Sequence, residues 1–566
     1  MSAAAAPSGP SVGELRELAL AWISDDPHAG DAAELKALLD ALPSTAAELA
    51  DRFSGSLTFG TAGLRGALRA GPNGMNIAVV RAAAAGLVRW LSSKSAPGSL
   101  VIGYDARYRS REFAQETARV ATGAGRAAFL LPGPLPTPVL AFAVRSLDAV
   151  AGVMVTASHN PPKDNGYKVY LGSLLGGEVG FGAQIAPPAD VEISASIRSV
   201  GSLRAVPLGP PGAVLGPEIV ESYVDSVARV VDPSSRRELA VAYTPFHGVG
   251  GSLLVSALTR AGFATPSIVD SQAAPDPDFP TLAFPNPEEP GAMDRVIELA
   301  RSVGADLALA NDPDADRCAV AVPMSSPVAA GSGGGDRWRM LRGDEVGVLL
   351  ADHLMRRGVS GRYAATVVSS SMLRAVCEKR DMPYGETLTG FKWIVRAGAD
   401  LVYGYEEAIG YCVAPNLVRD KDGISAALLL CELAASLRAK GRTLSDRLDE
   451  LAAEFGVYVT DQISVRVTDL REIEELMRRL RGAPPSRLLG EPVSVTDLLP
   501  DADVLVLRTD TARVVVRPSG TEPKLKAYLE VVVPVDDGVP EVRVQAAHRL
   551  IALHRETTEM LAYTPW

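Results

Sequence analysis

The stretch that decides the fold class runs from Leu100 to Thr156. It begins with LVIGY at Leu100–Tyr104, continues with REFAQETARVAT at Arg111–Thr122 and closes with AVAGVMVT at Ala149–Thr156. The outer segments are short, apolar and rich in β-branched residues, whereas the middle segment is amphipathic with helical spacing. A strand, a helix and a second strand in this order form a βαβ unit, and such units build mostly parallel sheets.

The same alternation continues through the middle of the chain. Strand-like runs recur at Leu239–Tyr243, Leu307–Ala310 and Ala364–Ser369, and a helical stretch at Gly251–Ala261 follows the first of them. No short-period repeat is present. We therefore expect several βαβ units and an α/β fold.

Both ends of the chain depart from this alternation. At the N-terminus, Ser11–Ile23 and Asp31–Leu42 have helical spacing and are separated by Pro27 and Gly30. At the C-terminus, strand-like and helical stretches follow a different order, which predicts a separate α+β domain. The expected strands are Tyr458–Val467, Val504–Thr509 and Leu529–Val533, and the expected helices are Leu470–Arg481 and Val542–Met560.

Length and composition limit the class of protein. The chain has 566 residues, of which 47% are hydrophobic and 22% charged, so it can bury several cores and is not globally disordered. At about 150 residues per domain, this length suggests three or four domains. Gly and Pro cluster at Pro207–Pro217, at Ser325–Gly335 and, less clearly, around Phe455, and we place the domain boundaries there.

Charge and hydropathy exclude two classes of partner. The 67 acidic and 56 basic residues give a net charge of −11, which argues against a general nucleic-acid binder. This charge still allows a local basic pocket for a phosphorylated small molecule. The most apolar stretches, Ile77–Leu91 and Ile424–Leu437, contain charged residues and fall short of about 18 uncharged residues, so we expect no membrane span.

The cysteines and the first residues predict the compartment. Cys318, Cys377, Cys412 and Cys431 are far apart and form no CxxC pair, so we expect buried thiols in a reducing compartment. Residues Met1–Pro10 lack the charged and apolar regions of a signal peptide. These features predict a cytoplasmic protein.

A serine follows one of the expected buried strands. The run Val153–Val155 leads into TASHNPP at Thr156–Pro162, which puts Ser158 at the carboxyl end of a sheet, where α/β folds bind ligands. Asn-Pro and Pro-Pro are turn dipeptides, so a plain turn is the better interpretation of this motif taken alone. No G-x-S-x-G sequence surrounds Ser158, which argues against an acyl-transfer triad.

Three aspartates follow another expected strand. The sequence NDPDADR at Asn311–Arg317 comes directly after Leu307–Ala310. In an extended loop alternate residues point the same way, so the carboxylates of Asp312, Asp314 and Asp316 would converge. Their mutual repulsion favours a bound cation, and hard oxygen ligands favour Mg²⁺ or Ca²⁺. The alternative is a solvated acidic turn, whereas an EF-hand is excluded because its Gly and its final Glu are missing.

A third polar loop lies near the C-terminus. The run Val514–Val516 leads into RPSGTEPK at Arg517–Lys524, where a guanidinium, two hydroxyls and glycine-exposed amides suit a phosphate dianion. An ordinary polar turn is an equal alternative for this loop alone. Gly404–Gly410 carries two glutamates beside glycines, which could accept hydrogen bonds from sugar hydroxyls. Thr389–Trp393 carries an aromatic residue and a lysine beside a glycine, which could contact a sugar or a phosphate. Packing with a surface charge is the alternative for both.

Taken together and in this order, the loops resemble the α-D-phosphohexomutase superfamily, which contains the phosphoglucomutases and phosphomannomutases. The resemblance extends from about Phe59 to about Glu530. The sequences FGTAGLRG at Phe59–Gly66, YTPFHG at Tyr243–Gly248 and PNPE at Pro285–Glu288 are similar to the branch that contains eukaryotic-type phosphoglucomutase-2 and many bacterial phosphosugar mutases.

The resemblance implies four domains in a heart-shaped arrangement around a central cleft. Three related α/β domains with mixed, mostly parallel sheets would precede the C-terminal α+β domain, and each domain would supply one active-site loop. The expected bounds are residues 1–205 for the domain with the phosphoserine loop, 206–325 for the metal-binding loop, 326–455 for the sugar-binding loop and 456–566 for the phosphate-binding loop.

The resemblance also implies a role for each site residue. Ser158 matches the family's catalytic serine, which is phosphorylated in the active enzyme and adds an oxygen ligand to the Mg²⁺ held by Asp312, Asp314 and Asp316. The other expected residues form two groups. His159, Lys168, Arg65 and Arg317 match functional positions near the phosphoserine, with Lys168 the expected general base and His159 its rival, while Glu406, Lys392, Gly390, Arg517, Ser519, Gly520 and Thr521 would bind the sugar and its phosphate.

The implied activity is interconversion of a hexose 1-phosphate and a hexose 6-phosphate, of glucose or mannose, through a hexose 1,6-bisphosphate that also acts as activator. Phosphopentomutase or glucose-1,6-bisphosphate synthase activity on the same fold is one alternative, and a catalytically silent sugar-phosphate-binding protein is another. Ala408 replaces the serine common in the family's sugar loop, which leaves the preferred sugar open.

Two segments and the assembly complete the expectations. Leu171–Phe181 and Val328–Gly335 resemble insertions that decorate the surface. The expected partner is a small-molecule phosphosugar, with neither nucleic acid nor membrane. A monomer or a dimer is expected.

Overall fold

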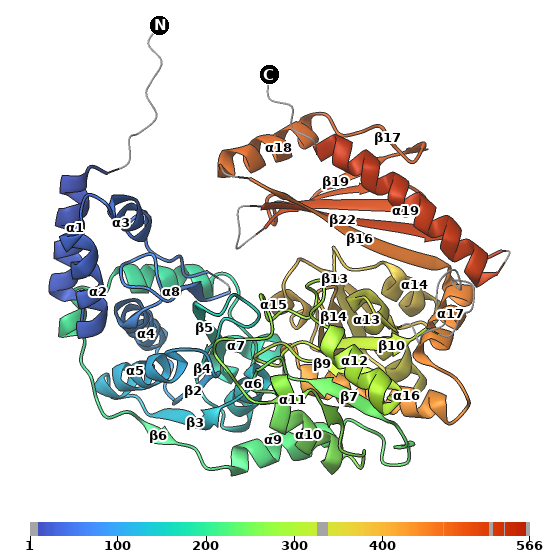
Figure 1. Cartoon of the computed structure of the whole chain (residues 1–566), viewed down its shortest axis with the longest axis horizontal. Helices are drawn as coiled ribbons and strands as arrows, with labels where there is room; N and C mark the ends of the chain where they lie inside the picture. The colour runs from blue at the N-terminus through green and yellow to red at the C-terminus, as the bar shows by residue number, and fades with distance from the viewer. Residues whose placement is uncertain are drawn as a thin grey trace, which may run out of the picture. The chain divides into compact units, whose positions relative to one another are not determined.

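The computed structural model describes residues 10–60, 62–324, 338–467, 469–519, 524–536 and 538–561 (Figure 1). The chain forms two compact units. The first contains Met1–Leu341, Phe391–Tyr403 and Gly410–Ser436, and the second contains Arg342–Gly390, Gly404–Ile409 and Leu437–Trp566. Among the described residues, no helix is both long enough and apolar enough to span a membrane.

Three helices open the first unit, namely α1 (Val12–Asp25), α2 (Ala29–Asp40) and α3 (Ala46–Arg52) (Figure 1). Helices α1 and α2 confirm the two helices predicted at the N-terminus. A capping box starts α1, because the side chains of Ser11 and Glu14 accept hydrogen bonds from each other's backbone amides. Helix α3 has only 7 residues and too few turns to show a periodic pattern, so it escaped prediction.

The first sheet has six strands in the order β1-β5-β4-β2-β3-β6. Strands β4, β2, β3 and β6 are parallel, and β5 and β1 run antiparallel at one edge. Every residue of β4 is buried, because helices α5 and α6 both pack against β2 and β4. The strands are β1 (Leu64–Ala67), β2 (Leu100–Tyr104), β3 (Ala128–Pro134), β4 (Ala151–Val155), β5 (Asp164–Leu171) and β6 (Ala213–Val214), and the helices are α4 (Ile77–Ser93), α5 (Ser110–Gly123), α6 (Thr137–Ser146), α7 (Ser173–Gly180) and α8 (Ala189–Arg198).

The second sheet has five strands in the order β11-β10-β9-β7-β8. Strands β9, β7 and β8 are parallel, and β10 and β11 are antiparallel. The carboxyl ends of β7 and β9 therefore meet, since Thr244 is paired with Ala310. The strands are β7 (Val241–Thr244), β8 (Ser267–Ile268), β9 (Leu307–Ala310), β10 (Ala319–Pro323) and β11 (Trp338–Met340), with helices α9 (Glu218–Ala228), α10 (Gly251–Arg260), α11 (Asp270–Ala273) and α12 (Asp294–Val303).

The third sheet has four strands in the order β13-β12-β14-β15, and the boundary between the two units falls within β14, after Tyr403. Strands β12 and β13 are parallel. Strand β15 and most of α16 belong to the first unit. The strands are β12 (Arg362–Thr366), β13 (Tyr384–Thr387), β14 (Leu401–Glu406) and β15 (Gly410–Cys412), with helices α13 (Gly343–Arg356), α14 (Met372–Lys379), α15 (Phe391–Ile394), α16 (Gly423–Arg438) and α17 (Leu444–Phe455).

The last sheet is antiparallel, in the order β16-β22-β21-β20-β19, and confirms the predicted α+β character of the C-terminus. Alternate residues of β21 enter different cores: Val514 and Val516 join the core shared with α18 and α19, whereas Val515 packs with Val367 and Val368. The strands are β16 (Val457–Arg466), β19 (Ser494–Asp497), β20 (Leu505–Arg508), β21 (Ala512–Pro518) and β22 (Lys524–Val533), with helices α18 (Leu470–Gly482) and α19 (Val539–Leu561) and the small hairpin β17 (Arg487–Leu488) and β18 (Glu491–Pro492).

The sheets confirm an α/β fold with mixed, mostly parallel sheets followed by an α+β region. The segment Leu171–Phe181, expected to decorate the surface, begins with the last residue of β5 and then forms α7. The other expected insertion, Val328–Gly335, lies outside the described residues. The heart-shaped arrangement stays a prediction.

Candidate active site

Ser158 lies in the loop that follows β4, at the carboxyl end of the parallel strands. Its backbone is left-handed, with φ of +52°, and only 2% of the residue is exposed. The Ser158 amide donates a hydrogen bond of 2.9 Å to Oγ1 of Thr156. The motif is therefore a turn, as its sequence alone indicates. In addition, the turn is buried and held by hydrogen bonds, and it presents the Ser158 hydroxyl.

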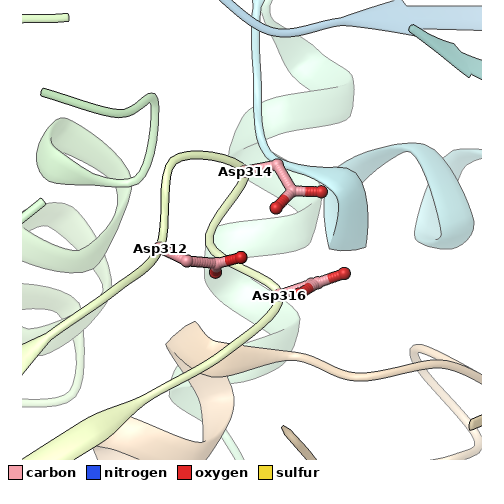
Figure 2. Close-up of side chains that lie close together, drawn as sticks. All are labelled: Asp312, Asp314 and Asp316. Carbon is pink, nitrogen blue, oxygen red and sulfur yellow. The ribbon is translucent and has the colours of Figure 1, made fainter. Parts of the chain in front are cut away.

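The three aspartates lie in the loop between β9 and β10, and Figure 2 shows their carboxylates projecting from one turn. One oxygen from each of Asp312, Asp314 and Asp316 lies within 4.8 Å of the others, and all three residues are buried. Convergence was predicted from an extended loop, and that reason is wrong. The loop turns back on itself, with Ala315 left-handed at φ of +51°, so the turn and not strand alternation brings the carboxylates together.

The serine loop and the aspartate loop meet. Oγ of Ser158 donates a hydrogen bond of 2.7 Å to Oδ2 of Asp312 and lies 3.1 Å from Nδ1 of His159. The backbone amide of Arg317 donates to Oδ1 of Asp312 at 3.0 Å. Residues that are 154 positions apart in sequence thus form a single polar cluster within the first unit.

Lys168 reaches this cluster from β5. Its Nζ lies 2.8 Å from Oδ2 of Asp314 and 3.2 Å from Oδ2 of Asp316. Burial opposes the charged ammonium, but the two carboxylates outweigh burial and raise the pKa of Lys168. The pKa of His159 shifts the other way, well below its ordinary value, because of burial and the nearby guanidinium groups of Arg317 and Arg65. Beside the Ser158 hydroxyl, the histidine is thus the neutral group and the lysine the charged one.

The carboxylates themselves titrate unequally. Burial, followed by repulsion from Asp314 and Asp316, holds the pKa of Asp312 well above its ordinary value. Burial opposes ionisation of Asp314 as well, but the Lys168 ammonium outweighs it and lowers the pKa of Asp314. Oδ1 of Asp314 and Oδ1 of Asp316 are buried and accept no hydrogen bond from the residues described. A buried group of three carboxylates, two of which keep an oxygen without a donor among the described residues, fits a hard divalent cation.

Arg65 and Arg317 are also placed at this cluster. Nη1 of Arg65, on β1, donates to Oδ1 of Asn160 at 3.3 Å, and Nε of Arg65 is buried with no acceptor among the described residues. Nε of Arg317 lies 3.8 Å from Oδ1 of Asp316. All eight residues expected at the phosphoserine and metal are therefore brought together, namely Ser158, His159, Lys168, Arg65, Arg317, Asp312, Asp314 and Asp316.

Sequence reasoning missed two residues that touch the carboxylates. Thr137, at the start of α6, donates to Asp314 through its hydroxyl at 2.6 Å, and its backbone amide donates to the Asp314 carbonyl at 3.0 Å. Nζ of Lys421 lies 3.4 Å from Oδ2 of Asp316. The run Arg419-Asp420-Lys421-Asp422 alternates charges directly before a long apolar helix, and that unusual pattern was the available signal.

The residues expected to bind sugar and phosphate are divided between the units. Glu406 is buried at the end of β14, and Arg517 and Ser519 follow the buried part of β21, all in the second unit. Gly390 has φ of +111° and also belongs to the second unit, while Lys392 on α15 belongs to the first. Gly520 and Thr521 lie outside the described residues. That these residues act together with Ser158 stays a prediction.

Four models of one protein family match successive parts of the chain. They are described as phosphoglucomutase/phosphomannomutase alpha/beta/alpha domain I at residues 56–202, domain II at 221–324, domain III at 342–455 and the C-terminal domain at 463–537. The chain belongs to the phosphoglucomutase/phosphomannomutase family. Membership confirms the resemblance, the four-domain fold and the enzyme class, a phosphohexomutase, which is an isomerase.

The mutase is similar to several curated proteins over most of its length. It is 43% identical over 496 residues to a Haemophilus influenzae protein named "Probable phosphomannomutase", covering 84% of this chain and 99% of that protein. It is 32% identical to the phosphopentomutase of Homo sapiens, covering 98% of this chain and 97% of the relative. It is 30% identical to a phosphoglucomutase of Staphylococcus aureus, covering 87% and 93%.

Among solved structures, the mutase has the fold of a phosphoglucomutase/phosphomannomutase family protein from Burkholderia thailandensis. The TM-score is 0.67 at 18% identity, and the match covers 90% of this chain and 98% of that one. At this identity the likeness shows the shared fold alone.

Proposed function

We propose that the protein interconverts a hexose 1-phosphate and a hexose 6-phosphate, of glucose, mannose or both, through a phosphoserine at Ser158. One observation carries the proposal. A buried serine hydroxyl, held in a left-handed turn, lies 2.7 Å from a carboxylate that belongs to a buried group of three. A structural serine has no need of such acidic surroundings, whereas phosphoryl transfer depends on placing and neutralising charge.

Asp312, Asp314 and Asp316 would hold a divalent cation, and we propose Mg²⁺ because all three offer hard oxygen ligands. When bound, Mg²⁺ supplies positive charge that stabilises a phosphoryl group and its leaving oxygen. Thr137 and Lys168 would fix the orientation of the Asp314 carboxylate through its Oδ2 atom, and Lys168 would also hold Asp316.

The proposed reaction has two transfers. In the first, the bond between phosphorus and Oγ of Ser158 breaks as phosphorus bonds to the free hydroxyl oxygen of a sugar monophosphate. The hydroxyl proton passes to a base, and a hexose 1,6-bisphosphate forms. After the bisphosphate turns end over end, the reverse transfer returns its other phosphoryl group to Ser158. Bisphosphate lost from the site must be replaced, which accounts for the proposed role of hexose 1,6-bisphosphate as activator.

His159 and Lys168 remain the two candidates for the base. His159 is favoured by charge, because its imidazole is neutral and lies 3.1 Å from Oγ of Ser158. Lys168 is an ammonium when it faces free carboxylates, and it would have to lose a proton before acting as a base. Arg65 and Arg317 would neutralise the transferring phosphoryl group.

The second unit, together with Lys392 of the first, supplies the groups proposed for recognition of the rest of the substrate. The Glu406 carboxylate would accept hydrogen bonds from sugar hydroxyls, and Arg517 with Ser519 would bind the phosphate that is not being transferred. Burial and the Glu407 charge raise the pKa of Tyr528. The Arg517 charge opposes this rise, so Arg517 lies near Tyr528. We extend the phosphate-binding role to Gly520 and Thr521 and the sugar-binding role to Gly390 and Lys392.

The test compares the protein with Ser158→Ala and with Ser173→Ala, in which an exposed hydroxyl that donates to Asp148 is removed. Each is incubated with Mg²⁺ and glucose 1,6-bisphosphate, and its intact mass is measured. We expect an adduct of about 80 Da, one phosphoryl group, on the parent and on Ser173→Ala but not on Ser158→Ala. Turnover should be lost with the adduct, and a Ser158→Ala protein that still turns over would exclude the mechanism.

A phosphopentomutase is the second candidate function, supported by the 32% identity to the human phosphopentomutase over nearly the whole chain. One assay separates the two candidates. Glucose 1-phosphate, mannose 1-phosphate, glucosamine 1-phosphate and ribose 1-phosphate are offered side by side, each with Mg²⁺ and bisphosphate. The sugar with the highest kcat/KM identifies the substrate class.

We also propose that the protein acts in the cytoplasm on a small-molecule phosphosugar. All four cysteines are buried free thiols, which suits a reducing compartment.

A further inference from the structure

Two buried charged residues outside the proposed catalytic set lie against the Ser158 loop. Asp105 and Arg107 follow β2, whose carboxyl end lies beside that of β4 in the parallel sheet. They are 2% and 4% exposed, and Nε of Arg107 lies 3.5 Å from Oδ2 of Asp105. A buried ion pair is costly unless it is extensively hydrogen bonded, so its contacts indicate what it does.

Arg107 binds the backbone of the serine loop. Its Nη2 donates to the carbonyl oxygens of Ser158 at 2.7 Å and Asn160 at 2.6 Å. Its Nη1 donates to the carbonyl oxygens of Pro161 at 2.7 Å and Asp164 at 3.2 Å. One guanidinium therefore gathers carbonyl groups from both ends of the loop, which only a planar fork with several donors can do.

Asp105 holds the other side of Ser158 through Thr156. Oδ2 of Asp105 accepts a hydrogen bond of 2.7 Å from the Thr156 hydroxyl, and Oγ1 of Thr156 accepts the one from the Ser158 amide at 2.9 Å. Oδ1 of Asp105 accepts from Ser110 at 2.6 Å and from the Arg107 amide at 3.0 Å. The amide and the carbonyl of Ser158 are thus both tied to the same pair of residues.

These ties account for the backbone of Ser158. Serine has no intrinsic preference for the left-handed region, so a φ of +52° persists only where surrounding contacts impose it. The Phe279 ring covers the guanidinium of Arg107, with Cζ 5.0 Å from the ring centroid, and only 2% of Phe279 is exposed. Asp105 and Arg107, here called the clamp, are therefore shielded from water.

We propose that Asp105 and Arg107 are positioning residues, which hold the Ser158 backbone left-handed so that Oγ faces the carboxylates of the metal site. The inference rests on the proposed function, because it assigns the pair a share in phosphoryl transfer at Ser158. The proposed role requires no contact with the sugar phosphate, since the contacts described above are with the serine loop, with Ser110, with Phe279 and between the two residues themselves.

The first test is Arg107→Lys, which keeps the charge but cannot bind the spread carbonyls together. The rate at which the protein accepts a phosphoryl group from glucose 1,6-bisphosphate is followed by intact mass. We expect a fall of about 100-fold, the scale associated with a displacement of about 1 Å at a reacting atom. Calorimetry with glucose 1-phosphate should show a Kd within about twofold of that of the parent, because sugar binding does not depend on the turn.

The second test is Thr156→Val, which removes the link between Asp105 and the Ser158 amide without removing a charge. We expect phosphoryl acceptance to fall by about tenfold, as for the loss of one hydrogen bond, again with little change in sugar phosphate binding. This variant decides the matter if Arg107→Lys does not fold.

The matched control is Arg145→Lys. Arg145 likewise donates to a backbone carbonyl, that of Phe181, and stacks on a phenylalanine ring 4.6 Å from its Cζ, but it does not touch the serine loop. It should accept phosphate at the parental rate. If Arg107→Lys and Thr156→Val also do so, or if they lose sugar binding and phosphate acceptance in parallel, the positioning role is wrong. If the parent itself neither accepts phosphate nor turns over any phosphosugar, the proposed function fails instead.

Discussion

At the scale of single residues, the site depends on how each carboxylate is oriented. Asp314 receives hydrogen bonds from Thr137 and Lys168 on the same oxygen, Oδ2, at 2.6 and 2.8 Å. Its other oxygen, Oδ1, accepts none from the described residues and is available to a cation. The donors therefore occupy Oδ2 and leave Oδ1 of Asp314 for the proposed cation.

Thr137→Val should weaken metal binding, because it removes the hydroxyl that fixes Asp314 and leaves the shape nearly unchanged. Loss of an outer hydrogen bond of this kind raises the Mg²⁺ concentration for half-maximal activity by about tenfold. Activity is titrated with Mg²⁺ for this variant and for Thr122→Val, whose hydroxyl lies within hydrogen-bond distance of backbone carbonyls. Identical Mg²⁺ requirements in the two variants would contradict this role of Thr137.

At the scale of helices and strands, an unusual helix start in the second unit gives a pH dependence. Asp344, in the first turn of α13, is buried, and burial raises its pKa to about 6 despite hydrogen bonds from the Ser370 amide at 2.7 Å and the Tyr405 hydroxyl at 3.1 Å. The nearby Glu530 charge raises it further, and the Thr460 hydroxyl opposes that rise.

The sign of the effect follows from proton binding. Between the unfolded pKa of 3.8 and the folded pKa of about 6, the folded protein holds a proton on Asp344 that the unfolded chain has lost. Stability from this group is therefore present below about pH 4 and is lost as the pH rises to about 6, by an amount of about 3 kcal/mol.

Asp344→Asn should remove this dependence. Amide hydrogen exchange of α13, corrected for the intrinsic exchange rate at each pH, measures its opening free energy from pH 4 to pH 7. We expect the free energy of the parent to fall relative to that of the variant across this range. If the opening free energies of the parent and of Asp344→Asn changed in parallel with pH, Asp344 would not titrate between pH 4 and pH 7.

Elements were predicted well where an apolar run or a helical period extends over several residues. Strands β2 and β9 have the predicted bounds, and α5 and α10 begin or end within a residue of theirs. Strands β6 and β8 have 2 residues each, too few to show alternation, and they escaped prediction.

The candidate site was predicted in its residues but not in its geometry. Ser158 and the three aspartates were found because each motif directly follows an apolar strand. The left-handed turns at Ser158 and Ala315 and the contacts of Arg107 were not predicted, because they depend on contacts between segments that are distant in sequence. The sequence DAR at Asp105–Arg107 does follow β2 as the serine motif follows β4, and this parallel was the signal available.

At the scale of the whole chain, a buried network joins regions of the second unit that are far apart in sequence. Glu530 on β22 accepts hydrogen bonds from the Ser370 hydroxyl at 2.7 Å and the Ser371 amide at 2.8 Å, and it pairs with Arg513 at 3.1 Å. Arg513 also donates to the Val367 carbonyl at 3.1 Å. The last sheet is therefore fixed to the segment that follows β12.

Glu530→Gln should weaken this attachment, because it leaves the buried Arg513 without its charged partner. The loss of one member of a buried pair costs about 3–5 kcal/mol. We expect hydrogen exchange to increase both at residues 367–371 and in β22, and the unfolding temperature of the second unit to fall.

The matched control is Arg543→Gln. Its ion pair with Asp449 joins α19 to α17 but is partly exposed on both sides, so its loss should cost no more than about 1 kcal/mol. Equal effects of Glu530→Gln and Arg543→Gln would show that the buried network contributes nothing special.

The boundary between the two units within β14 limits which truncated fragments could fold. The backbone crosses from one unit to the other five times, after Leu341, Gly390, Tyr403, Ile409 and Ser436. Neither unit is a continuous stretch of sequence, so no single truncation yields one of them whole. A fragment ending at Leu341 would keep Ser158 and the three aspartates but lose Lys421, together with β15 and α16. During synthesis, the unit that contains Ser158 therefore cannot complete its packing until residues up to Ser436, about a hundred codons after Leu341, have been made.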